Sequence, residues 1–246
     1  MRARCPDLFC LAVLALVILA GPAAAQDVSI DLGEGGSLAG RTVQLLLLVT
    51  VIGLAPGILV MVTCFPFIVT VLAILRQAIG LQQSPPNMLM VSLALFLTYF
   101  VMEPVLTEAY RAGVAPLLAD EMALDEAFRA ASAPLQRFMA ARVDLDTLAE
   151  MAALRPDVDP LVPAGEAPLS VLVPSFLLSE IARAFQVGFL IFLPFLIIDL
   201  VVAAVLMSMG MMMVPPAIVS LPFKLAFFVV ADGWALVAAS LVRGYG

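Results

Sequence analysis

The chain has 246 residues, of which 63% are hydrophobic and 13% charged, and this composition excludes an ordinary soluble domain and is typical of membrane proteins. A formal net charge of −7 without clustered cations excludes a nucleic-acid surface. The absence of histidine excludes Ser-His-Asp and Cys-His catalysis and removes the commonest ligand of catalytic zinc.

Residues 1–25 have the pattern of a secretory signal peptide. Two arginines form a positive n-region, residues 8–20 form an apolar core, and residues 23–25 are alanines that provide a cleavage site. The mature chain would then begin outside the cytoplasm. The alternative is an uncleaved first membrane helix, although the apolar core is short and a Gly-Pro pair interrupts it.

Residues 26–106 are predicted to contain a Gly-rich lead-in and a first helical hairpin. One apolar stretch runs from about Thr42 to Leu75, broken by prolines, and a second covers Met88 to Leu106. Each reaches or exceeds the roughly 20 residues that a membrane helix needs.

Residues 107–170 form a segment of different character. They carry eleven acidic residues and five arginines, about half of all the charges in the chain. Apolar residues recur there at three- and four-residue spacings, which predicts short amphipathic helices, and a proline-rich loop follows from Arg155 to Pro174. The signal peptide places this water-facing segment on the extracytoplasmic side.

Residues 171–246 are predicted to form a second hairpin from two further apolar stretches. The loop between them runs from Met207 to Pro216 and is rich in methionine. Loops are normally built from polar turn formers, so this one indicates a soft apolar surface that meets something hydrophobic. Lipid-facing or core methionine is the alternative interpretation.

An internal repeat relates the two hairpins. Each has glycine, four intervening residues and Pro-Pro between its apolar stretches. Because glycine ends helices and proline begins them, both segments are predicted to be hairpin tips that point the same way. The alternative is that two ordinary turns resemble each other by coincidence. The tip residues are Gly80, Pro85, Pro86, Gly210, Pro215 and Pro216.

Ionisable residues inside apolar stretches are costly and are functional candidates. Glu180 and Arg183 have the spacing of a pair along one helix, whereas Asp199 and Lys224 lack a local partner and are expected to pair across helices or subunits. Asp199 and Asp232 are predicted to be buried acids. We favour structural pairing over ion conduction because no face carries a ladder of acids.

Several long motifs closely resemble the FliP family, flagellar biosynthetic proteins of the type III export gate, and its SctR-type counterparts in virulence injectisomes. The motifs cover nearly all of the mature chain. The chain departs from the family at Pro66-Phe67, where flagellar members usually carry Thr-Arg. The matching segments are residues 75–80, 84–87, 94–98 and 187–200, the methionine loop, Leu221 to Lys224, and Asp232 to Trp234.

The resemblance implies an all-α protein of membrane-type hairpins with a small helical extracytoplasmic insertion, assembled as a ring of five copies. FliQ and FliR would join the ring, contact with FlhB is implied as well, and unfolded polypeptides would pass through the ring. In that family Glu180 and Lys224 are expected to form an ion pair between neighbouring subunits. Four methionines are expected to form a gasket around the pore: Met209, Met211, Met212 and Met213.

We therefore predict a non-enzymatic export-gate subunit without cofactor or metal, located in the bacterial inner membrane and flagellar basal body with the acidic segment in the periplasm. The equivalent injectisome subunit is one alternative. A proton-coupled transporter that uses Glu103, Asp199 and Asp232 is another. An intramembrane protease with Asp199 and Asp232 as a dyad lacks any supporting motif.

Overall fold

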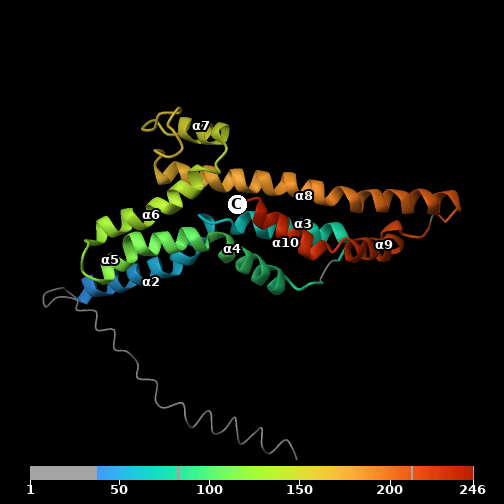
Figure 1. Ribbon diagram of the computed structural model, residues 1–246, viewed down its shortest axis with the longest axis horizontal. Coiled ribbons are helices and arrows are strands. Elements are labelled where there is room, and N and C mark those ends of the chain that lie inside the picture. The colour runs from blue at the N-terminus through green and yellow to red at the C-terminus, as the bar shows by residue number, and fades with distance from the viewer. Residues whose placement is uncertain (1–37, 82–83, 212, 246) are drawn as a thin grey trace, which may run out of the picture. The chain divides into compact units, whose positions relative to one another are not determined.

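The computed structural model describes residues 38–81, 84–211 and 213–245, and every regular element in these ranges is a helix (Figure 1). The predicted signal peptide and Met212 lie outside the described residues. The chain divides into two units, residues up to Val51 and residues from Ile52 onward. In the first unit the described residues form the beginning of α2.

The prediction of an all-α fold is confirmed for the described residues, whereas the ring stays a prediction. The helices are α2 (Leu38–Met61), α3 (Phe65–Ile79), α4 (Asn87–Ala109), the π-helix η1 (Tyr110–Val114), α5 (Ala115–Leu118), α6 (Leu124–Ala140), α7 (Leu145–Ala153), α8 (Leu169–Ser208), α9 (Pro216–Val230) and α10 (Gly233–Arg243).

Two described helices are long and apolar enough to cross a membrane, Asn87–Leu118 and Leu169–Ser208. The number rises to four if α2 with α3, and α9 with α10, each count as one bent span. The second span is longer than predicted. It does not end at Leu106, because the π-helical turn of η1 carries the helix on into α5.

The main core lies where α3 packs against α8 and α4. Ile68, Val71 and Leu75 of α3 are fully buried. Gly188 of α8 permits the close crossing with α3, since a Cβ there would lie 2.4 Å from Cδ1 of Ile74 and 3.2 Å from its Cβ. In Figure 1, α8 accordingly runs alongside α3 and continues beside α9.

The acidic segment folds on a smaller core of its own. Met139, Leu148 and Phe176 are buried between the end of α6, α7 and the start of α8. The predicted amphipathic helices are therefore present as α6 and α7. The loop that follows is shorter than predicted, because α8 already begins at Leu169 and contains Pro174.

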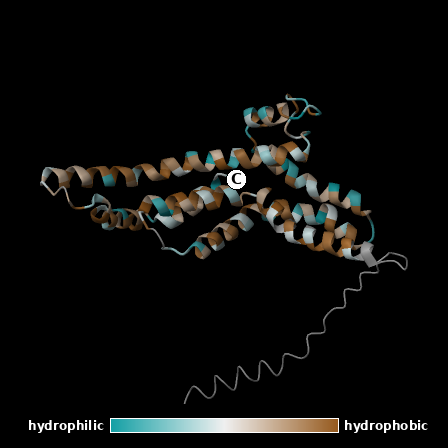
Figure 2. Ribbon diagram, turned by 180° about the vertical axis from the view of Figure 1, so that it is seen from behind, coloured by the Kyte–Doolittle hydropathy of each residue, from teal (hydrophilic) through white to brown (hydrophobic). Residues whose placement is uncertain are grey.

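Much apolar surface remains uncovered by the chain itself. Of the most apolar stretch of 18 residues in α8, only 11% is buried. Phe189 and Leu200 of this helix are 62% and 71% exposed. Figure 2 shows hydrophobic residues along α8 and hydrophilic ones on α7 and its neighbouring loop. A surface of this size requires cover from lipid or from other protein chains.

Candidate functional site

The methionine turn, residues 207–216, is a tight reversal between α8 and α9. Gly210 has φ +75°, a left-handed conformation that glycine adopts without strain. Its N–H donates to the carbonyl of Met207 at 3.1 Å, and the N–H of Met211 donates to that of Leu206 at 3.0 Å. These two bonds form a Schellman motif, which satisfies the last carbonyls of α8.

Proline defines the other side of this turn. Pro215 is the N-cap of α9 and Pro216 is its first residue, where a missing N–H costs nothing. The two ends of the turn therefore have a defined backbone, although the turn is rich in apolar residues.

The described methionines of the turn are exposed. Met209 is 67% exposed and Met213 is 98% exposed, and Met211 is exposed as well. The fourth predicted gasket residue, Met212, lies outside the described residues. A thioether side chain has three rotatable bonds, so this group can repack around a partner of varying shape.

The first hairpin tip is built from different residues on a similar plan. Gly80 ends α3 with φ +89°, and Pro86 is the N-cap of α4. Arg76 donates to the Asn87 side chain and, at 3.4 Å, to the carbonyl of Pro85. This tip is therefore closed by side-chain hydrogen bonds, whereas among the described residues of the methionine turn the Ser208 hydroxyl donates only back into α8, to the Val205 carbonyl at 2.7 Å.

Glu180 of α8 is the centre of a buried charged cluster. It is fully buried, and its Oε1 lies 3.2 Å from Nε of Arg142 and 3.4 Å from Nη1 of Arg183. The Tyr245 hydroxyl donates to Oε2. A carboxylate without water is tolerable only with partners of this kind. The predicted pair of Glu180 with Arg183 is thus present.

Tyr245 closes this cluster from the end of the chain. The guanidinium carbon of Arg142 lies 3.8 Å above the tyrosine ring centre, and Nη1 of Arg142 donates to the Gly244 carbonyl at 2.9 Å. Burial, and secondly the negative charge of Glu180, raise the pKa of the Tyr245 hydroxyl above its ordinary value. Tyr245 therefore stays protonated and keeps donating.

Lys224 of α9 is the centre of a second cluster. Its ammonium lies 2.6 Å from Oδ2 of Asp199 on α8 and 3.1 Å from the carbonyl of Ala78 on α3. The Lys224 side chain is 7% exposed and that of Asp199 is 33% exposed. The expectation that these residues pair across helices is confirmed.

The predicted ion pair between Glu180 and Lys224 of neighbouring copies stays a prediction. Within the chain each residue already has oppositely charged partners, and the two clusters share no residue. A contact between copies would have to use these same groups.

The prediction that Asp232 is buried is wrong for the chain. Asp232 is exposed, because it lies at the break between α9 and α10, which meet at a bend of 61°. It adopts a left-handed conformation with φ +48° at this break. Asp199 is only half-buried, since it reaches Lys224 at the margin of the packed helices.

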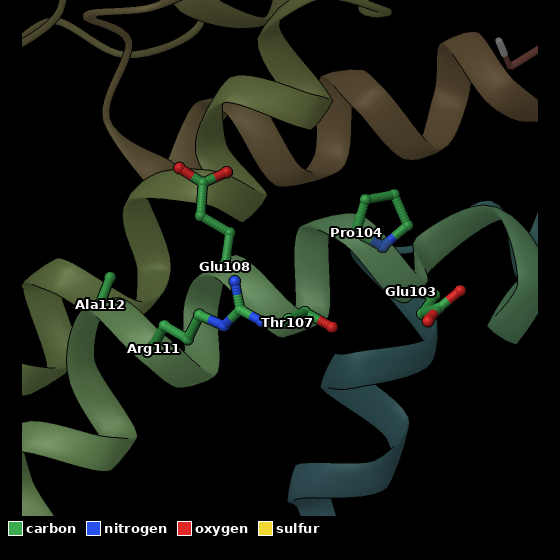
Figure 3. Close-up of a pocket in the computed structure, with 6 residues that line it drawn as sticks. All are labelled: Glu103, Pro104, Thr107, Glu108, Arg111 and Ala112. Atoms are coloured by element: carbon green, nitrogen blue, oxygen red, sulfur yellow. The ribbon is translucent and has the colours of Figure 1, made fainter.

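Glu103 lines an open hollow of about 670 Å³ on α4 and η1. Figure 3 shows the Glu108 carboxylate directed away from Arg111 and Glu103, and Glu108 instead pairs with Arg137 of α6 at 2.5 Å. The acids of this hollow thus do not converge on one point. No hydrogen bond between described residues joins Glu103, Asp199 and Asp232 to one another; Asp199 pairs with Lys224, and Asp232 is exposed.

The sequence alone does not indicate that Arg142 and Tyr245 belong to this site. Arg142 lies in the acidic segment, where it resembles a solvated arginine, and Tyr245 follows the last apolar stretch. The charge of Glu180 does predict a partner, but spacing alone does not reveal one that lies 38 or 65 residues away.

Comparison with known proteins gives consistent matches over most of the chain. The model of the FliP family matches residues 48–241. The flagellar biosynthetic protein FliP of Caulobacter vibrioides is 56% identical over 96% of this chain and 88% of its own length. The FliP proteins of Bacillus subtilis and Aquifex aeolicus are 47% and 40% identical, over 83% and 95% of this chain and 92% and 98% of their own lengths.

Proposed function

Since this chain belongs to the FliP family of flagellar biosynthetic proteins, components of the type III export apparatus, we propose that it is a pore-forming subunit of the flagellar export gate. Unfolded polypeptides would leave the cytoplasm through this pore. The observation that carries the proposal is the exposed methionine turn at the tip of the second hairpin.

Methionine suits a seal that must also open. Its unbranched side chain fills irregular gaps and excludes water, yet it changes rotamer at little cost and adapts to any passing chain. The two ends of the turn, defined by Gly210 and by the Pro-Pro pair, would hold such side chains at the same position in each copy. Met209, Met211, Met212 and Met213 of each copy form the proposed gasket.

A ring of copies agrees with the uncovered surface of the chain. Apolar faces of α4 and α8 are exposed, including Phe96, Tyr99 and Phe189, and neighbouring subunits would cover them. In the proposed assembly five copies join FliQ and FliR in the inner membrane or basal body, next to FlhB. The acidic segment, residues 107–170, would lie on the periplasmic side.

The contact between copies would include Glu180 and Lys224. A double charge exchange, Glu180→Lys with Lys224→Glu, tests this contact against the pairs within the chain. Recovery of the ring in the double variant, after its loss in each single variant, would support an inter-subunit pair. Loss in all three would assign both residues to their partners within the chain.

The gasket is tested by replacing Met211, Met212 and Met213 with alanine together. We expect the membrane of cells that carry this variant to leak small solutes while flagellar protein export persists, because the seal is lost but the pore remains. Met88→Ala is the matched control, since Met88 is 81% exposed beside the other tip. Unchanged permeability in the triple variant would contradict the proposal.

A further inference from the structure

We propose that Asp199 is a positioning residue for the methionine turn. It acts through Lys224 to hold the tip of the second hairpin in a fixed position relative to the first. This inference rests on the proposed function of the turn as a seal. Its basis is the cluster of Asp199, Ser220, Lys224 and the Ala78 carbonyl, which we call the clamp.

The clamp joins both hairpins through one ammonium group. Ala78 lies in the last turn of α3, where carbonyl groups lack partners within the helix and the helix dipole is negative. Lys224 therefore caps α3 at 3.1 Å while its 2.6 Å contact with Asp199 binds α9 to α8. The first tip begins two residues later, at Gly80, whose ideal Cβ position is 3.6 Å from Leu221 of α9.

Both oxygens of Asp199 are engaged, which fixes the direction of its carboxylate. Oδ2 contacts Lys224, and Oδ1 lies 2.5 Å from the hydroxyl of Ser220, a fully buried residue of α9. Ser220 and Lys224 are four residues apart and lie on the same face of α9. One carboxylate of α8 thus holds one turn of α9 at two points.

The methionine turn extends beyond the clamp on two arms. At a helical rise of 1.5 Å per residue, about 14 Å separates Asp199 from Ser208, and about 12 Å separates Lys224 from Pro216. Between the clamp and the turn Leu206 is buried and Val202 and Val219 are half-buried, whereas Leu200, Val205 and Ile218 are 71%, 51% and 70% exposed. The position of the turn therefore depends on the clamp as well as on these few apolar contacts.

Asp199→Asn tests the inference, because it keeps the size of the side chain and removes its charge. In cells, we expect small-solute permeability to rise by about tenfold. This change corresponds to about 1.4 kcal/mol in the equilibrium between the sealing and the displaced positions of the turn. Ring formation and protein export should persist. Glu103→Gln is the matched control, since this exposed carboxyl makes no contact with the clamp.

A distance measurement separates positioning from a general loss of stability. Spin labels at Met213→Cys and Ser84→Cys report the separation of the two tips in the full-length chain. We expect Asp199→Asn to broaden or shift this distance distribution and Glu103→Gln to leave it unchanged. An unchanged distribution in Asp199→Asn would overturn the inference.

The two leak measurements also separate the clamp from the gasket. If the triple methionine variant leaks but Asp199→Asn does not, the role of the clamp is contradicted while the gasket stands. If neither leaks, the gasket itself fails.

Discussion

The hydroxyl of Tyr245, the penultimate residue, donates a hydrogen bond to the buried carboxylate of Glu180 in α8. The tyrosine ring also lies edge-on to Phe67 of α3 at 5.5 Å and is stacked on Phe138 of α6 at 6.2 Å. One residue at the end of the chain therefore links α3, α6 and α8.

Tyr245→Phe removes the hydroxyl and keeps the ring. We expect the free energy of unfolding to fall by about 1–2 kcal/mol, because Glu180 loses one donor but keeps both arginines. Thermal unfolding of the purified protein in detergent measures this change. Tyr99→Phe, on an exposed tyrosine, is the control, and equal stability of the two variants would contradict the role of the hydroxyl.

Gly113→Ala should disturb the contact of η1 with α6. A Cβ at Gly113 would lie 2.3 Å from the backbone oxygen of Ala127 and 2.8 Å from the backbone nitrogen of Ala131, so no side-chain rotation relieves the clash. We expect destabilisation of about 1–3 kcal/mol, measured by thermal unfolding. Gly53→Ala is the control, since open space surrounds that helical glycine; comparable effects of both changes would be inconsistent with this packing.

The stability of the first turn of α7 should depend on pH, because the Asp144 carboxylate caps this helix. Its Oδ2 accepts hydrogen bonds from the N–H of Thr147 at 2.9 Å and from its hydroxyl at 2.8 Å, and these bonds lower the pKa of the Asp144 carboxyl. A lowered pKa in the folded state stabilises the helix above the ordinary pKa of aspartate, about 4, and this stabilisation is lost as pH falls through the folded value.

We therefore expect faster amide exchange in α7 below about pH 4, after correction for the intrinsic pH dependence of exchange. Hydrogen-exchange mass spectrometry of peptides that cover residues 144–153 measures it. Asp144→Asn can still accept the bonds but does not titrate, so its α7 should lose the pH dependence. An identical profile in both proteins would assign the effect to another group.

The export gate and the proton-coupled transporter predict opposite effects of replacing Asp232. A proton-coupled mechanism requires this carboxyl, whereas the structure places it exposed at the break between α9 and α10. Asparagine tolerates the same left-handed backbone, so we expect Asp232→Asn to keep flagellar export and swimming motility near the level of the parent protein. Abolished export with normal assembly would favour the transporter.

The sequence predicts the helices and turns well because local rules govern them. Gly210 and the Pro-Pro pair fix the end of one helix and the start of the next, and both can be read from residue type. That Asp199 and Lys224 have partners across helices or subunits also follows, because an isolated charge in an apolar stretch needs a partner, but their contact with each other comes from the structure.

Contacts between distant segments are not encoded in such local rules. Arg142 binds Glu180 because α6 and the loop after it fold back onto α8, and Asp232 is exposed at the break where α9 and α10 meet at a bend. The extension of α4 through η1 is missed for another reason. Charged residues such as Glu108 and Arg111 mark a surface, yet a helix continues through them.

The most direct test of a shared methionine seal is disulfide cross-linking of Met213→Cys in a chain whose Cys5, Cys10 and Cys64 are replaced by alanine. If the turns of several copies meet around one pore, mild oxidation in native membranes should give a covalent dimer. Met88→Cys, at a position that is 81% exposed near the start of α4, should give much less. Efficient dimer formation at position 88 but none at position 213 would contradict a shared seal.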